Sequence, residues 1–140
     1  MVSMNFIPID KSIKSVFPHA QIIQTSDAFY SAQPSGRENT LTSIESGKVY
    51  IVKNAIAETL QIAGNPQALD APVSLSKGIQ LLLYPYYNNS SIANFTSGIS
   101  SQMNKIKNLS DFYIYGSSGN VLRNFEKTKG YYIDVSDNCV

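Results

Sequence analysis

One pattern of apolar and polar positions occurs twice in this chain. Residues 41–54 and 122–135 each begin with Leu, carry a second apolar residue three positions later, and then pass a turn that contains Lys and Gly. Each stretch ends in an apolar and aromatic run in which Tyr50 corresponds to Tyr131. Such a run predicts a half-buried strand that is entered through a turn. Because the pattern occurs twice, we predict two copies of one structural unit.

The first half contains several short apolar runs that are separated by turn-forming residues. Pro18 is expected to end a short helix that follows Asp10 or Ser12, since proline cannot continue a helix. The remaining runs predict strands, at residues 6–9, 20–24, from 28 onward, 49–53 and 58–64.

The second half repeats this order. The dense apolar run at residues 79–84 predicts a buried central strand. Apolar residues spaced by three and four predict an amphipathic helix over residues 92–103, which Gly98 weakens. Strands at residues 106–109 and 111–115 and a tight turn at 116–120 follow. The predicted core includes Tyr50, Leu82, Tyr131 and Ile133.

These patterns predict the fold class and the division of the chain. We expect one α+β domain over residues 1–140, made mainly of short antiparallel strands. Its two pseudo-repeated halves, about residues 5–63 and 79–140, each have one short helix. A hinge rich in Gly, Pro and Asn, residues 64–72, joins the halves.

Composition limits the classes of function. With 43% hydrophobic residues the chain can form a core, but only 15% of its residues are charged, which is a low share that extracellular and virion proteins often have. The formal net charge is +1 and Lys and Arg are not clustered, so we expect no nucleic-acid partner. We also expect no secretory signal and no membrane span, because no stretch approaches about 20 apolar residues.

Two stretches of the second half resemble a known repeat. Residues 75–85 read Leu-Ser-Lys-Gly-Ile-Gln-Leu-Leu-Leu-Tyr-Pro, and residues 128–135 read Thr-Lys-Gly-Tyr-Tyr-Ile-Asp-Val. They resemble the duplicated Gly-Trp-Asn-type β-rich repeat modules of secreted and surface bacterial proteins. Ile79 and Gln80 stand where that motif has Trp-Asn, and Tyr132 where it has a second Trp. The resemblance implies a non-catalytic surface module and carries over no ligand residues.

Candidate catalytic chemistry is sparse. His19 is the only histidine, and Cys139 lies one residue from the end, where we expect it to be frayed. Neither fits a nucleophile–base arrangement. Asp27 and Asp111 align in the two halves and are the one acid–base pair to consider, against the alternative that each forms an Asx-turn. We therefore predict no catalytic, cofactor-binding or metal-ligating residues, and no cofactor.

Tyrosines in the second half are the predicted interface residues: Tyr86, Tyr87, Tyr113 and Tyr115. Tyr combines a large apolar ring with a polar tip, which suits a protein interface or a sugar-stacking platform. Tyr86 and Tyr87 are the best candidates, because they follow Pro85 and precede a polar loop. The alternative is that both rings fold back over the helix that follows.

The resulting prediction is a non-enzymatic structural or attachment protein, namely a virion component such as a capsid, spike or tail protein. It is expected to work as an oligomer with protein partners, in a virion or on an extracellular surface. The alternative is a surface adhesin or an accessory carbohydrate-binding module of a bacterial secreted protein, with a surface glycan as partner. A small hydrolase that uses Asp27 and Asp111 is a third and weaker alternative.

Overall fold

The computed structural model describes residues 1–33, 38–67 and 72–140, and its described elements are mainly β. The elements before the middle of the chain are β1 (Val2–Ser3), β2 (Phe6–Pro8), α1 (Ile13–Val16), β3 (Ala20–Gln24), β4 (Phe29–Ser31), β5 (Val49–Asn54) and β6 (Gly64–Pro66). Those that follow are β7 (Gly78–Leu83), β8 (Ser90–Ser91), α2 (Ile92–Phe95), the 3₁₀ turn η1 (Ser97–Ile99), β9 (Met103–Lys107), β10 (Phe112–Ile114), β11 (Asn124–Phe125) and β12 (Gly130–Val135). The predicted α+β class with short antiparallel strands is confirmed in outline, with the balance further toward β.

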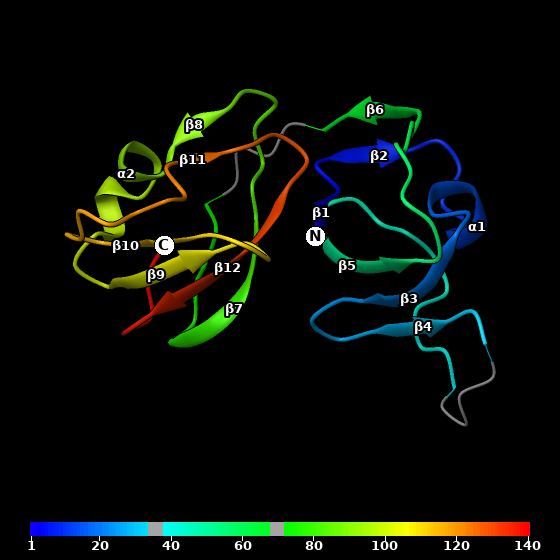
Figure 1. Cartoon of the computed structure of the whole chain (residues 1–140), viewed down its shortest axis with the longest axis horizontal. Coiled ribbons are helices and arrows are strands. Elements are labelled where there is room, and N and C mark those ends of the chain that lie inside the picture. Colours follow the sequence, from blue (N-terminus) through cyan, green and yellow to red (C-terminus); the bar gives the residue numbers. More distant parts are fainter. Residues whose placement is uncertain (34–37, 68–71) are drawn as a thin grey trace.

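Two four-stranded sheets stand side by side, one in each half (Figure 1). Their strand orders are β1-β5-β3-β4 and β7-β12-β9-β10, and every pairing is antiparallel. In each sheet, the strand that comes first in the sequence lies at an edge and pairs with the strand that comes last in the sequence. A short helix lies between the first and second sheet strands of each half, α1 in one and α2 in the other.

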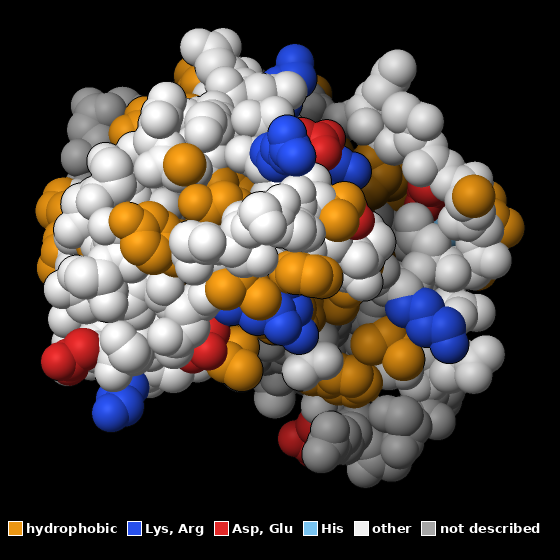
Figure 2. All heavy atoms as spheres, turned by 60° about the vertical axis from the view of Figure 1, so that its left-hand side comes forward, with side chains coloured by type: hydrophobic (Ala, Val, Ile, Leu, Met, Phe, Trp, Pro, Cys, Tyr) orange, Lys and Arg blue, Asp and Glu red, His pale blue; other side chains and the backbone are white. Residues whose placement is uncertain are grey.

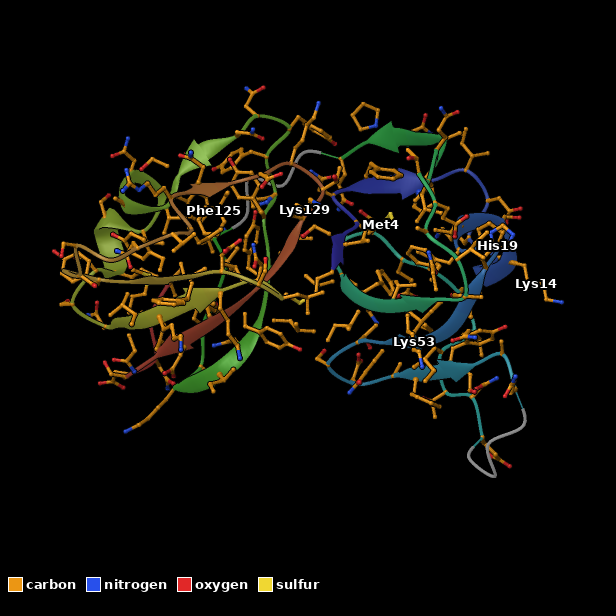
Figure 3. The ribbon with its side chains drawn as sticks, viewed as in Figure 1. Met4, Lys14, His19, Lys53, Phe125 and Lys129 are labelled. Carbon is orange, nitrogen blue, oxygen red and sulfur yellow. The ribbon has the colours of Figure 1, made fainter. Side chains whose placement is uncertain are left out.

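Each half has its own hydrophobic core, on which the inner face of its sheet packs. The predicted core residues Tyr50, Leu82, Tyr131 and Ile133 are all buried, which confirms that prediction. Met4 lies in the first core and Phe125 in the second, on either side of the junction between the halves (Figure 3).

The two aligned tyrosines make the same hydrogen bonds. The backbone N–H of Glu45 donates to the Tyr50 hydroxyl at 2.8 Å, and that of Glu126 donates to the Tyr131 hydroxyl at 2.7 Å. Both rings are almost fully buried, at 0% and 1% exposed. A buried phenol needs such a partner, so each bond fixes the turn that leads into the last strand.

Burial raises the pKa of Tyr50, Tyr84 and Tyr131 above the ordinary tyrosine value. At a pH above about 10 the unfolded chain therefore releases these protons while the folded chain keeps them. We expect the melting temperature to fall by about 5 °C as the pH rises through that range. Thermal unfolding between about pH 8 and about pH 11 measures this. The variant Tyr131→Phe should have a weaker pH dependence, and an equal dependence in the two proteins would contradict this prediction.

Strand β1 joins the two halves. The Ser3 N–H donates to the Thr128 carbonyl at 2.8 Å, and its hydroxyl donates to the Lys129 carbonyl at 2.5 Å. Figure 3 places Lys129 where the second half faces the first. Gly130 is required here, because a Cβ at this position would lie 2.4 Å from Cγ1 of Val49. The halves are therefore in direct contact through backbone atoms.

The predicted helix over residues 92–103 is wrong beyond its first turn. Helix α2 ends at Phe95, η1 follows, and Met103 already belongs to β9. The hydroxyl of Thr96 donates to the carbonyl of Ile92 at 2.7 Å, and residues rich in Ser and Gly come next. Such residues are weak helix formers, so the apolar spacing alone did not extend the helix.

The predictions around the first strand and the hinge also need correction. Strand β2, within predicted residues 6–9, pairs with β6, and β1 instead of β2 has the sheet position that corresponds to β7 in the second half. No strand covers residues 58–63. The hinge predicted at residues 64–72 begins with a strand, β6. A Cβ on Gly64 in this strand would lie 2.2 Å from the Phe6 ring. Residues 68–71 of the predicted hinge lie outside the described residues.

Candidate functional site

The second half contains an apolar groove of about 330 Å³. It lies between β7, the segment formed by α2 and η1, and the end of the chain. The lining consists of Pro72, Val73, Leu75, Leu82, Pro85, Tyr86, Phe95, Thr96, Gly98, Ile99, Ile133 and Val140. None of these side chains is charged, and several belong to the core of the second half. Figure 2 turns this half forward and shows patches of hydrophobic side chains on a surface with few charges.

Backbone pairing near the C-terminus shapes the mouth of the groove. The N–H of Leu75 donates to the Cys139 carbonyl at 2.8 Å, and the N–H of Cys139 donates back at 3.0 Å. Cys139 is therefore held in place, and the prediction that it is frayed is wrong. The pairing brings Val73 and Val140 to the same rim of the groove, where Val140 is 71% exposed.

The two halves differ in one residue beside the groove. Phe17 and Thr96 follow their helices in the same way, since the N–H of Phe17 donates to Ile13 at 2.7 Å and that of Thr96 to Ile92 at 2.9 Å. Phe17 is buried in the first core, where its ring packs against Tyr50. Thr96 is also buried, at 2% exposed, but its side chain is much shorter, and it is one of the residues that line the groove.

Tyr86 is the predicted interface residue that lies in the groove. Its ring packs edge-on against Tyr84 and Phe95, with centroid distances of 5.8 Å in both cases. The ring thus folds back over α2, as the alternative interpretation held, yet the residue is still 51% exposed. These contacts hold an exposed aromatic surface in a fixed position beside the groove.

The other three predicted residues lie elsewhere. The Tyr87 hydroxyl donates to the carbonyl of Asn5 at 2.9 Å and accepts from the N–H of Gln67, so Tyr87 joins the two halves. Tyr113 is half-buried and lines a different, shallow pocket. Tyr115 is exposed in the turn after β10. The structure therefore does not bring the four tyrosines together, and whether any of them makes an interface stays a prediction.

The aspartates considered as an acid–base pair do not occupy equivalent positions. Thr25 N–H donates to the carbonyl of Ala28, and Asn108 N–H donates to that of Asp111, so Asp111 corresponds to Ala28. Asp27 forms part of a local turn in which it accepts from the Thr25 hydroxyl at 2.9 Å. The pKa of Asp27 is lowered mainly by this hydrogen bond and, to a smaller extent, by the nearby Lys48 ammonium group. The proposed match between Asp27 and Asp111 is wrong by one position, and the two residues line separate pockets.

The remaining chemical groups form no obvious centre. His19 lies at the edge of the first half, and its Nδ1 is 2.8 Å from a Glu58 carboxylate oxygen (Figure 3). Within the described ranges, no three His, Cys, Asp or Glu side chains lie close enough to hold a metal ion. No helix in the described part of the chain is long and apolar enough to cross a membrane.

Comparison with protein-family models, curated proteins and solved structures found no match to this chain. The function must therefore be inferred from the groove and from the chemistry of its lining. The sequence pattern singled out Tyr86 but not Thr96 among the residues that line the groove. The signal for it was present, because Phe17 and Thr96 each lie four residues after an Ile that begins a helix.

Proposed function

We propose that the chain is a non-enzymatic structural or attachment protein that assembles with other copies of itself through the apolar groove. The observation that carries this proposal is a lining without charged side chains, with Tyr86 held at its side. Rigid aromatic rings beside an apolar pocket are typical anchors of protein interfaces. The net charge of +1 adds little repulsion between copies.

The chemistry of the groove favours an apolar protein side chain over a sugar. Only Thr96 and Tyr86 contribute polar side-chain atoms to the lining, and the Thr96 hydroxyl already donates to Ile92. A sugar would find few side-chain partners there for the hydrogen bonds that it loses to water, which is costly. An aliphatic or aromatic side chain loses none and gains from burial.

A groove on one copy that takes a different surface of the next makes a head-to-tail contact. Such contacts close into rings or continue as filaments, which are the forms that structural assemblies take. We propose a virion as the setting, with the chain as a capsid, spike or tail protein. The low share of charged residues supports this setting, and a bacterial surface adhesin is the alternative.

We also propose that the two halves are copies of one unit. The equal strand orders and the matching hydrogen bonds of Tyr50 and Tyr131 support this. The strand registers give β1 the same position in the first sheet that β7 has in the second. This correspondence favours a first copy that begins at Val2 instead of at residue 5. The groove then marks a place where the copies have diverged.

Substitution of the two neighbouring tyrosines separates assembly from stability. We expect Tyr86→Ser to weaken self-association about tenfold or more, because it removes an interface anchor. Tyr87→Ser should leave self-association unchanged and cost about 1–2 kcal/mol of unfolding free energy, because it removes the bonds to Asn5 and Gln67. Sedimentation velocity over a range of concentrations and urea unfolding measure the two effects. Wild-type protein that is monomeric at every concentration would rule out the proposal.

A further inference from the structure

A second, polar pocket lies beside the start of α2, and we propose that it binds a sugar that carries a carboxylate. The pocket is lined by Ser91, Ala93, Tyr113, Ser117, Ser118, Asn120 and Arg123 and measures about 320 Å³. It shares no lining residue with the apolar groove. The inference therefore goes beyond the proposed self-assembly and does not depend on it.

Arg123 supplies the charge. None of the residues that line the pocket is acidic, and among the described residues Arg123 has no ion pair. Its side chain makes one long bond, from Nε to the Asn120 carbonyl at 3.4 Å. The guanidinium thus keeps donors for a ligand, and its planar fork fits a carboxylate with two parallel hydrogen bonds.

The loop beneath Arg123 is held in one geometry by Asn120. The Asn120 side chain accepts from Ile114 N–H at 2.7 Å and donates to the carbonyls of Ile114 and Ser117, both at 2.9 Å. A pocket wall that is already ordered costs little to order on binding. The serine hydroxyls can bond to sugar hydroxyls, and the Tyr113 ring offers an apolar surface to a sugar face.

The first half contains the same loop anchor without the charge. Asn39 accepts from Ser31 N–H at 2.8 Å and donates to the Ser31 carbonyl at 3.1 Å, as Asn120 does with Ile114. Arg123 lies three residues after Asn120, and the residue three after Asn39 is Thr42. The positively charged residue is therefore absent from the equivalent position of the first half. The loop there carries Thr, so Thr is a suitable replacement for Arg123.

The test is a titration of the full chain with N-acetylneuraminic acid, followed by amide shifts in NMR spectra. We expect saturable shifts at Tyr113 and in residues 117–123, and about tenfold or greater loss of affinity in Arg123→Thr. Galactose, which is neutral, should bind about tenfold more weakly or worse. Arg123→Thr should keep the melting temperature and the self-association of the wild type.

Three results would overturn this inference: no shifts at the pocket, equal affinity in Arg123→Thr, or inorganic sulfate binding as tightly as the acidic sugar. The last result would identify a general anion site instead of a sugar site. Tyr86→Ser serves as the reverse control, since it should leave the titration unchanged. A negative titration with intact self-association would refute only the sugar site.

Discussion

Phe125→Ala is expected to lower the free energy of unfolding by about 4 kcal/mol, because it removes the ring at the centre of the second core. The Phe125 ring is fully buried and stacks on Tyr84 at 5.0 Å. It also meets Phe95 at 5.1 Å and Tyr131 at 4.8 Å, both edge-on. The substitution thus removes apolar burial and three aromatic contacts together. Urea unfolding at neutral pH measures the change.

The first half offers a matched control for this substitution. Ile44 aligns with Phe125 and is also fully buried, but as an aliphatic residue it takes part in no aromatic stacking. We expect Ile44→Ala to cost about 3 kcal/mol, as aliphatic truncations do. A loss below about 1 kcal/mol for Phe125→Ala would show that the aromatic cluster does not hold the second half together.

The duplicated stretch predicted the most reliable parts of this fold. Its alternating positions identified Tyr50 and Tyr131 as core residues and placed them on the last strand of each sheet. This worked because one apolar face of a strand against a core leaves a period of two in the sequence. The strand predicted at 79–84 is present as β7 (Gly78–Leu83), but its description as a buried central strand was wrong, because β7 lies at the edge of its sheet and Ile79 is 70% exposed.

Long-range pairing and side-chain competition could not be predicted from local patterns. Strand β1 has only two residues, and its place depends on bonds to β5 and to Thr128, far away in the sequence. The helix after Ser91 ends early, where the Thr96 hydroxyl bonds to the Ile92 carbonyl and residues rich in Ser and Gly follow. The same residue lines the groove, and a pattern of apolar spacing carries no information about a cavity.

Thr96→Phe is expected to weaken self-association about hundredfold, as loss of a central anchor site does. The substitution copies Phe17, which has the equivalent position in the first half and is buried there. Its ring should occupy the groove and exclude the side chain of the neighbouring copy. The change loses the bond from Thr96 to Ile92, so the unfolding free energy must be measured alongside.

A second variant keeps the test valid if Thr96→Phe does not fold. Val140→Asp adds a charge at the exposed rim of the groove, where burial against another copy would then be costly. Gln61→Glu adds the same charge at an exposed position of the first half and serves as its control. Val140→Asp should weaken association, and Gln61→Glu should not.

The most direct test of the groove is the sedimentation velocity of wild type, Thr96→Phe and Val140→Asp over the same range of concentrations. The structure predicts that the wild type forms larger species as concentration rises, while both variants stay monomeric with their melting temperatures preserved. Assembly of the variants at wild-type concentrations, or a wild type that never associates, would contradict a self-assembly role for the groove.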